Sequence, residues 1–327
     1  MKAIVQDAYG SPDVLQLSDI EQPVPGENEV LIRVHAAGVD PGVWHLMTGL
    51  PYLTRLFGFG LTRPKNRVRG RDVAGVVEEV GAKVVGFRPG DAVFGTCEGS
   101  FAEYVCAKQD KIAPKPTMLS FEQAAAVPIS ATTALQGLRS SGKAQSGEKV
   151  LVIGAGGGVG LFAVQMAKAF GADVTGVCST SKVELVRQAG AGHVIDHAKE
   201  DFTDGPERFD LILDTAGNRP LKQLRKALTP RGRLVIVGGE GGGRWLGGFQ
   251  RGMGAPLHSL FRGQNFSGLI AVERQDDLQA VSALINAGKV TPVIDRTFLL
   301  PEAPDAIRYA HEGGVRGKVV VTVVSEG

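Results

Sequence analysis

The fold is decided by residues 149–160, which read Lys149-Val-Leu-Val-Ile153-Gly-Ala-Gly-Gly-Gly158-Val-Gly160. An apolar, strand-like run leads into a cluster of glycines, and the helical pattern of residues 161–168 follows. At such a junction the backbone N–H groups of the helix N-terminus can meet a pyrophosphate, because glycine has no side chain to block the approach. The stretch therefore predicts a dinucleotide-binding strand–turn–helix unit. The alternative is a glycine-rich turn that holds no ligand.

The glycine fingerprint has its best register as Ala155-x-Gly157-x-x-Gly160, and Gly158 adds further backbone freedom. The strand before it and the helix after it are the context that makes the pattern specific. We therefore expect the cofactor to be bound by Ala155, Gly157, Gly158, Val159 and Gly160.

The end of the next strand indicates which dinucleotide is bound. The acidic residue that would hold the ribose 2′-hydroxyl of NAD is expected about 20 residues further on, but no carboxylate occurs between Asp173 and Glu184. Ser179, Ser181 and Lys182 stand there instead, and hydroxyls with a cation suit the 2′-phosphate of NADPH through charge-assisted hydrogen bonds. We expect NADPH rather than NADH. The alternative is that Ser181 and Lys182 only begin the next helix, because serine is a good helix cap.

Around this junction, strand-like and helix-like patterns alternate from about residue 122 to residue 288. The expected strands are Lys149–Ile153, Val174–Val177, Leu211–Asp214, Leu234–Val237 and Ser267–Val272. The expected helices are Phe121–Val127, Thr132–Ser140, Val159–Phe170, Lys182–Ala189 and Pro220–Leu228. Short apolar runs separated by helices predict right-handed βαβ units and a buried, doubly wound parallel sheet.

The first 121 residues have a different, β-rich pattern, in which apolar and polar positions often alternate and Gly or Pro bounds most runs. The expected strands there are Met1–Gln6, Glu29–Ala36, Asp72–Val80 and Asp91–Gly95. The tail from Val290 is again strand-like and ends in Lys318–Val324, so we expect it to return to the first domain. The predicted fold class is α/β, with one β-rich domain of residues 1–121 and 290–327 and one Rossmann domain of residues 122–289.

Composition excludes several classes of protein. With 327 residues, 43% hydrophobic and 21% charged, the chain is long enough for two folded domains of roughly 100–200 residues and is not disordered. A net charge of +2 gives no global reason to bind nucleic acid or an anionic membrane. Cys97, Cys106 and Cys178 are too scattered for a disulfide framework, and neither a signal peptide nor a long apolar run is present. We expect a soluble, cytoplasmic protein.

An ordered series of motifs covers nearly the whole chain. It comprises Met1-Lys2-Ala3, Pro23-Val-Pro25-Gly26-Glu27-x-Glu29-Val30-Leu31, Ala36-Ala-Gly38-Val39-Asp40-Pro41, Gly70-x-Asp72-x-Ala74-Gly75-Val76-Val77, Gly86-x-x-x-Gly90-Asp91-x-Val93, Gly99-x-Phe101-Ala102-Glu103-Tyr104, the glycine turn and Gly317-Lys318-Val319-Val320. With these motifs the chain resembles the zinc-independent quinone oxidoreductase branch of the medium-chain dehydrogenase/reductase superfamily. The resemblance implies a β-rich, GroES-like catalytic domain built from both chain ends beside a Rossmann domain.

The resemblance also bears on metal. In the zinc-dependent branch a Cys follows the Gly-Val pair of the first domain and a His-Glu pair precedes the later Ala-Gly, whereas this chain has Asp40 and Arg71-Asp72 at those places. No Cys cluster near residues 95–110 suits a structural zinc. We therefore expect no metal, and hydride transfer to an acceptor that is already electrophilic, such as a quinone or an α,β-unsaturated carbonyl.

Several further cofactor contacts are implied by the resemblance. Asp40 stands where the family commonly has an Asn near the nicotinamide amide, and His197 stands where it has a Tyr. The match places Thr133 beside the nicotinamide, although Thr133 is equally suited to the start of a helix. Lys318, in the terminal motif, is a further candidate for cofactor binding.

Two glycines at predicted strand ends complete the set of cofactor candidates. Gly217 follows Leu211–Asp214, and Gly238 follows Leu234–Val237. Ligands of open parallel sheets bind beyond the carboxyl ends of the strands, so we expect Gly217 near the ribose and Gly238 at the cofactor.

Aromatic residues in a Gly- and Pro-rich segment are the candidates for the substrate pocket. Trp44 and Tyr52 can line a pocket for a flat, conjugated substrate or can simply be packed. Tyr52 is the first candidate for proton donor and His45 the second, with an ordered water as the alternative. A lone histidine such as His45 is more often a structural histidine with its hydrogen bonds satisfied.

Two charged segments leave alternatives open. Residues 63–71 form a basic run that suits either a solvated loop or an anion contact. Residues 238–251 have an Arg/Gly pattern that suits either an RNA-binding segment or a lid over the nicotinamide.

The functions that compete with a quinone or enone reductase are a zinc-free alcohol dehydrogenase or carbonyl reductase, and a non-catalytic NADPH- or RNA-binding protein. We expect a homodimer that pairs through the Ser267–Val272 strand.

Overall fold

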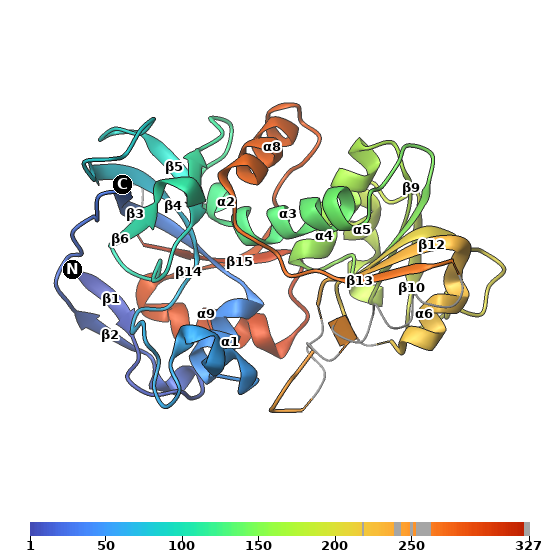
Figure 1. Cartoon of the computed structure of the whole chain (residues 1–327), viewed down its shortest axis with the longest axis horizontal. Coiled ribbons are helices and arrows are strands. Elements are labelled where there is room, and N and C mark those ends of the chain that lie inside the picture. Colours follow the sequence, from blue (N-terminus) through green and yellow to red (C-terminus); the bar gives the residue numbers. More distant parts are fainter. Residues whose placement is uncertain (218, 239–242, 249–250, 253–262, 324–327) are drawn as a thin grey trace. The chain divides into compact units, whose positions relative to one another are not determined.

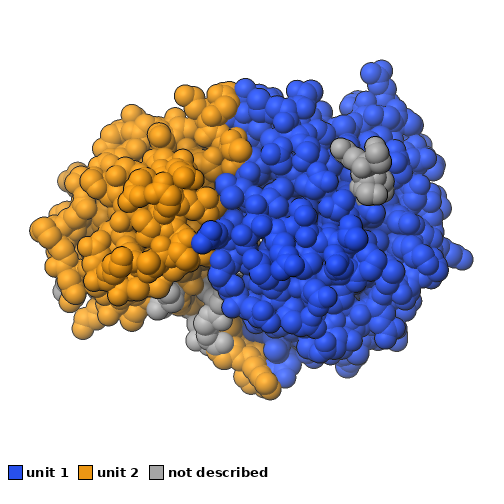
Figure 2. Space-filling model, turned by 180° about the vertical axis from the view of Figure 1, so that it is seen from behind, with its two compact units in different colours: residues 1–130, 273–286, 292–327 blue, residues 131–272, 287–291 orange. Residues whose placement is uncertain are grey.

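The computed structural model describes residues 1–217, 219–238, 243–248, 251–252 and 263–323 (Figure 1). The chain packs as two compact units, coloured separately in Figure 2. The first contains residues 1–130, 273–286 and 292–327, and the second contains residues 131–272 and 287–291. Residues 122–130 and 273–286 thus pack with the β-rich unit, whereas the sequence pattern had placed them with the other.

The first unit is built on a mainly antiparallel sheet of seven strands. In spatial order these are β14 (Ile294–Leu299), β15 (Lys318–Thr322), β3 (Glu29–Val39), β4 (Asp72–Val80), β5 (Ala92–Thr96) and β7 (Ile112–Pro114), with β6 (Tyr104–Lys108) also paired to β3. A separate antiparallel pair consists of β1 (Lys2–Val5) and β2 (Gln16–Asp19). Because β15 pairs with β3, the tail of the chain returns to the N-terminal sheet as expected.

The helices of this unit are α1 (Pro41–Thr48), α2 (Phe121–Ala125), α8 (Gln275–Asn286) and α9 (Ala303–Glu312). Of these, the sequence pattern had predicted only α2, whose start is fixed by a capping box between Ser120 and Gln123. The signals for α1 were also in the sequence: Asp40 caps its N-terminus, Pro41 occupies the first turn, and Gly49 ends it at a φ of 62°.

The second unit is a six-stranded sheet in which every neighbouring pair is parallel. The strands are, in spatial order, β10 (His193–Asp196), β9 (Asp173–Cys178), β8 (Lys149–Ile153), β11 (Phe209–Asp214), β12 (Leu228–Ile236) and β13 (Asn265–Gly268). Numbered along the chain from β8, this order is 3-2-1-4-5-6, which defines a Rossmann sheet. The predicted fold class is confirmed.

The helices of the sheet follow the predicted strand–helix alternation. They are α4 (Gly158–Ala169), α5 (Val183–Gln188) and α6 (Leu221–Ala227). α3 (Pro128–Leu135), whose first three residues belong to the first unit, precedes them and is continued by a π-helical segment, Gln136–Ser141. α4 packs on β8 and β9, and α6 packs on β12. The core here is aliphatic and aromatic, with Leu151, Ile212 and Phe266 among its buried members.

One expected strand, Ser267–Val272, was wrong over most of its length. β13 begins earlier, at Asn265, and ends at Gly268. Leu269 still donates to the Ile236 carbonyl at 2.8 Å. At Val272 the side chain of Gln136 takes the place of a strand partner, with Nε2 donating to the Val272 carbonyl at 2.6 Å and Oε1 accepting from its N–H at 3.1 Å. No helix in the described part of the chain is long and apolar enough to cross a membrane.

Candidate functional site

The glycine turn lies between β8 and α4, at the point where the strand order of the sheet reverses. Gly157 is the N-cap of α4 and contributes no side-chain capping group. The Gly157 N–H donates to the Gly154 carbonyl at 3.0 Å, and the helical ladder is joined at Leu161, whose N–H lies 2.9 Å from the Gly157 carbonyl. The N–H groups of Gly158, Val159 and Gly160 thus stand before the start of the helical ladder, where an anion can accept from them.

Two glycines of the turn, Gly154 and Gly160, have separate steric reasons. Gly154 has a φ of 79°, a conformation that L side chains rarely adopt. A Cβ on Gly160 would lie 2.1 Å from the Gly154 carbonyl oxygen, so the helix and the strand can approach only without a side chain there. Ala155 has a different place from the one expected: it is fully buried, and its N–H donates to the Val177 carbonyl at 2.9 Å.

The end of β9 brings the candidate phosphate residues beside this turn. Residues 180–182 form a short 3-10 turn preceded by Ser179, and α5 begins only at Val183. The aliphatic part of Lys182 covers Gly156, where a Cβ would lie 2.6 Å from the lysine Cδ. Ser179, Ser181 and Lys182 therefore lie in a turn next to the glycines. Ser179 makes no side-chain cap bond to the 3-10 turn.

Asp196 is a carboxylate that the sequence pattern missed at this end of the sheet. It ends β10 and stands opposite Cys178 in the parallel register. Its Oδ2 accepts from the Thr180 hydroxyl at 2.8 Å, and its Oδ1 accepts from the Ala198 N–H at 3.1 Å. Only a correct prediction of β10, which is short and mixed in polarity, would have revealed it. His197, the next residue, is exposed, and its N–H donates to the Cys178 carbonyl at 3.1 Å.

The end of β11 carries a second carboxylate that we had not singled out. Asp214 is fully buried; it accepts from the Gly217 N–H at 2.9 Å and forms an ion pair with Arg251 at 3.0 Å. Gly217 has a φ of 68°, so the Asp214 bond and the left-handed backbone together define this turn. A Cβ on Gly238 would lie 2.5 Å from the Thr215 carbonyl oxygen. Both predicted glycines thus occupy turns at strand ends.

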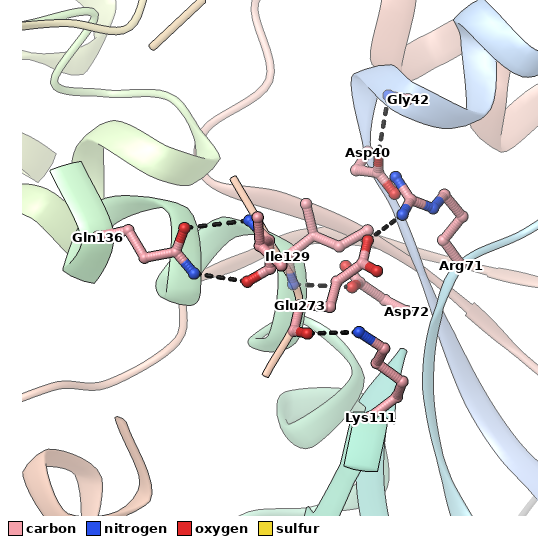
Figure 3. A network of polar contacts seen from close by, with 9 residues as sticks. Asp40, Gly42, Arg71, Asp72, Lys111, Ile129, Gln136 and Glu273 are labelled. Atoms are coloured by element: carbon pink, nitrogen blue, oxygen red, sulfur yellow. Dashed lines mark hydrogen bonds and ion pairs between the residues drawn. The ribbon is translucent and has the colours of Figure 1, made fainter. Parts of the chain in front are cut away.

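A buried ionic cluster lies in the first unit. Lys318 and Asp72 are almost completely buried, and the lysine Nζ lies 3.2 Å from the Asp72 Oδ2 and 3.1 Å from the Ser130 hydroxyl. The other oxygen of Asp72 accepts from the Ile129 N–H at 2.9 Å, in the first turn of α3 (Figure 3). Burial raises the pKa of Asp72 to about 6, although Lys318 acts in the opposite direction.

Arg71 lies beside this cluster and connects two more carboxylates. It forms an ion pair with Glu273, and its guanidinium lies next to Asp40 (Figure 3). Burial alone would lower the pKa of Arg71, but Asp40, Glu273 and Asp72 together raise it. The Oδ1 of Asp40 accepts from the Gly42 N–H at 2.7 Å, while its Oδ2 is buried without a hydrogen-bond partner among the described residues.

The predicted substrate residues lie on or just after α1. The indole of Trp44 stacks on the ring of His311 with 3.4 Å between ring centroids, and Trp44 packs against the core of the first unit. The guanidinium of Arg55 lies 4.8 Å from the centre of the Tyr52 ring. The Nδ1 of His45 lies 2.8 Å from the Leu50 carbonyl oxygen, a contact that suits a structural histidine. Trp44 is thus packed, and His45 is held by a hydrogen bond.

The remaining predictions have mixed outcomes. The basic run is not a uniformly solvated loop: Arg67 pairs with Asp7 at 2.6 Å, and Arg69 is buried, which lowers its pKa to about 10. Thr133 is buried within α3.

The Arg/Gly segment of residues 238–251, predicted as a lid or an RNA-binding segment, lies in part outside the described residues, at positions 239–242 and 249–250. Across the described ranges, no group of three or more His, Cys, Asp or Glu side chains is arranged to hold a metal ion.

Comparisons with known proteins agree with both halves of this architecture. Residues 26–117 match the family model of the alcohol dehydrogenase GroES-like domain, and residues 189–321 match that of a zinc-binding dehydrogenase. The 2-methylene-furan-3-one reductase of Solanum lycopersicum is 35% identical over 98% of this chain and 79% of its own. The quinone oxidoreductase of Mus musculus is 35% identical over 98% of this chain and 97% of its own. The solved quinone oxidoreductase of Coxiella burnetii has a TM-score of 0.86 and 30% identity, covering 99% of each chain.

The chain belongs to the medium-chain dehydrogenase/reductase superfamily, a class of pyridine-nucleotide-dependent oxidoreductases. Within that superfamily it falls in the quinone oxidoreductase branch. The resemblance inferred from the motifs is therefore confirmed, including its GroES-like domain.

Proposed function

We propose that this chain is a metal-independent reductase that transfers hydride from NADPH to a quinone or an α,β-unsaturated carbonyl compound. The observation that carries the proposal is the position of Lys182. The aliphatic part of its side chain covers Gly156 of the glycine turn. Lys182 therefore lies at the same end of the sheet as the N-terminus of α4. A pyrophosphate at that helix end would bring the 2′-phosphate of an adenosine ribose toward the Ser179–Lys182 turn.

The chain's own residues fit such a cofactor. The absence of a Cβ at Gly160 lets the helix approach the strand, and the Gly158, Val159 and Gly160 amides supply donors for the pyrophosphate. Ser179, Ser181 and Lys182 supply donors for the 2′-phosphate, and Gly217 and Gly238 form the turns at the ends of the next strands. His197, Thr133 and Lys318 remain proposed contacts. For Lys318, the ion pair with Asp72 supports an indirect role.

The cofactor, when bound, supplies the hydride, and the protein supplies binding, orientation and the exclusion of water. Asp40 is proposed beside the nicotinamide because one of its buried oxygens can accept a hydrogen bond from an amide. Tyr52 is proposed to hold the proton that the reduced acceptor takes up, with His45 as the second candidate. Trp44 and Tyr52 are proposed to border the acceptor.

The names of the relatives support the acceptor class. The tomato relative is a reductase of a methylene-furanone, and the mouse and Coxiella proteins are quinone oxidoreductases. Metal independence is supported by the side chains at the places of the zinc ligands, which are Asp40 and Arg71-Asp72. A zinc-free alcohol dehydrogenase or carbonyl reductase is the competing assignment.

The test of the cofactor assignment is the Lys182→Ala variant. A hydrogen bond to a charged group contributes about 1.5–3 kcal/mol, so we expect the Kd for NADPH to rise about tenfold to a hundredfold and the Kd for NADH to stay nearly constant. Lys149→Ala, at the other end of β8 in an exposed ion pair with Glu207, is the matched control. Equal losses for NADPH and NADH would contradict the assignment.

The acceptor is tested with chelator-treated protein and three compounds: 1,2-naphthoquinone, an alkenal and a simple aldehyde. Oxidation of NADPH by the quinone or the alkenal is expected. Turnover of the aldehyde alone would support the competing carbonyl reductase, and activity that is lost on chelation and restored by zinc would contradict metal independence. NADPH binding without turnover, or strongly salt-dependent binding of RNA, would support a non-catalytic protein.

Assembly and location also belong to this proposal. β13 is the edge of the described parallel sheet, paired with β12 only, and the side chain of Ile270 beyond it is 79% exposed. An edge strand followed by an exposed apolar residue supports a homodimer that pairs through β13.

The free cysteines Cys97, Cys106 and Cys178 support a reducing, cytoplasmic location.

A further inference from the structure

The turn that follows β9 is held by a carboxylate from the neighbouring strand. Asp196 ends β10 in register with Cys178 at the end of β9. The Thr180 hydroxyl donates to its Oδ2 at 2.8 Å, so the second residue of the Ser179–Lys182 turn is tied directly to β10. Two backbone hydrogen bonds add to this contact. The Lys182 N–H donates to the Ser179 carbonyl within the turn, and the His197 N–H, just after β10, donates to the Cys178 carbonyl at the end of β9.

Both oxygens of this carboxylate accept hydrogen bonds from the protein. Oδ1 accepts from the Ala198 N–H, and Oδ2 accepts from Thr180 and lies 3.5 Å from the Lys199 ammonium. The Thr180 hydrogen bond lowers the pKa of Asp196, so the carboxylate is ionised at neutral pH. Its side chain is only 9% exposed, in contrast to Lys199 at 72%.

This arrangement bears on the choice between NADH and NADPH. A carboxylate at the end of a strand in a Rossmann sheet reads the ribose of NADH by accepting from the 2′-hydroxyl. In this chain Asp196, at the end of β10, accepts hydrogen bonds instead from the Thr180 hydroxyl and the Ala198 N–H. A carboxylate engaged in this way orients the turn, and its charge is compensated by the Thr180 hydroxyl, the Ala198 N–H and Lys199.

We propose that Asp196 is a positioning residue for cofactor specificity: through Thr180 it holds the Ser179–Lys182 turn in the shape that presents Ser179, Ser181 and Lys182 to a 2′-phosphate. The inference rests on the proposed NADPH dependence. It predicts that removing a negative charge close to the phosphate site weakens phosphate binding, the reverse of what simple charge repulsion would give.

The experiment measures Kd by calorimetry for NADPH, NADH and 2′,5′-ADP, a probe that has the 2′-phosphate without the nicotinamide. In Asp196→Ala and in Thr180→Val we expect the Kd for NADPH and for 2′,5′-ADP to rise about tenfold, with the Kd for NADH changed by less than about threefold. The double variant is expected to be no worse than Asp196→Ala, because Thr180→Val removes only a hydrogen bond that Asp196→Ala has already removed. Thr180→Ser, which keeps the hydroxyl, should bind like the wild type.

Lys199→Ala is the matched control, because it removes an exposed charge beside Asp196 and leaves the Thr180 bond intact. Unchanged or tighter NADPH binding in Asp196→Ala would overturn the proposal, and tighter binding would show that Asp196 acts as a repulsive charge. If Asp196→Ala does not fold, an unchanged ratio of NADPH to NADH affinity in Thr180→Val overturns the proposal equally. Wild-type protein without a preference for NADPH would overturn the proposed cofactor, and this inference with it. A wild type that prefers NADPH together with an unchanged Thr180→Val variant would overturn this inference alone.

Discussion

The glycine turn of the second unit and the buried ionic cluster of the first are built in opposite ways. The turn uses backbone groups from one continuous stretch, residues 153–161, and its geometry depends on the absence of side chains at Gly154 and Gly160. The cluster uses charged side chains that are far apart in the chain, since 246 residues separate Lys318 from Asp72 and 202 separate Glu273 from Arg71. A local motif can be recognised from its letters, whereas a distributed cluster needs the register of the sheet.

The two regions also differ in what a substitution would cost. At Gly160 in the turn the cost of a side chain is steric, because the nearest atoms are backbone atoms that cannot rotate away. In the cluster the cost is electrostatic, because the loss of one partner leaves a charge buried without compensation.

Lys318→Met is expected to lower the free energy of unfolding by about 3–5 kcal/mol, because Asp72 would remain buried without its ammonium partner. Chemical denaturation at pH 7.5 measures the change. Lys2→Met, which breaks the exposed ion pair with Asp19, is the control and should change stability little. The double variant Asp72→Asn/Lys318→Met should recover part of the loss. A loss in Lys318→Met as small as that in Lys2→Met would show that the cluster does not stabilise the fold.

Gly160→Ala is expected to lower the free energy of unfolding by about 2 kcal/mol, since a Cβ 2.1 Å from the Gly154 carbonyl oxygen outweighs the gain of up to about 1 kcal/mol in helix propensity. Nucleotide binding should be lost with it. Gly157→Ala is the matched variant, because its Cβ would lie 3.4 Å from the same oxygen, in ordinary contact. Thermal melting of both variants measures the effect. Equal melting temperatures would mean that the turn is not set by close packing.

The pH dependence of stability sharpens the comparison further, because the turn contains no titratable group and the cluster does. The pKa of Asp72 is raised from 3.8 to about 6 in the folded protein, so the folded state binds the proton more tightly than the unfolded state. The contribution of Asp72 to stability is therefore greatest below about pH 4 and is lost as the pH rises to about 6, by at most about 1.4 kcal/mol per pH unit. Denaturation of the wild type and of Asp72→Asn between pH 4 and pH 7 gives this contribution as a difference. We expect the free energy of unfolding of the wild type, relative to that of Asp72→Asn, to fall as the pH rises. A rise in this relative stability with pH would contradict the raised pKa of Asp72.

Much of the second unit could be predicted from the sequence. Lys149–Ile153 was expected and observed with the same bounds, and the helix after the glycines was displaced by a single residue at each end. β10 was missed because four residues with only two apolar side chains do not give a clear period. The expected strand Ser267–Val272 was wrong after Gly268, and at Val272 the side-chain amide of Gln136 takes the place of a strand partner, a bond that no local pattern records.

The candidate site was predictable to the same extent. Lys182 and the glycines were identified because phosphate recognition uses residues at a fixed distance along one βαβ unit. Asp196, which holds the turn of Thr180, was not identified, because it comes from the next strand and its role depends on the pairing of β9 with β10. Lys318 was named as a direct cofactor residue, and no local signal related it to Asp72.

The sequence by itself determined the strand–glycine–helix unit, the alternation around it and the family, because steric requirements and apolar periodicity act over a few residues and are written in consecutive letters. Only the tertiary structure decided which charges meet. β3 lies between β4 and β15, and Gly38, which pairs with both Asp72 and Val320, leaves the room that the Asp72 carboxylate needs. The physical reason is that an ion pair between distant segments exists only after the sheet has chosen its neighbours and its register, and desolvation then makes that pair strong or costly.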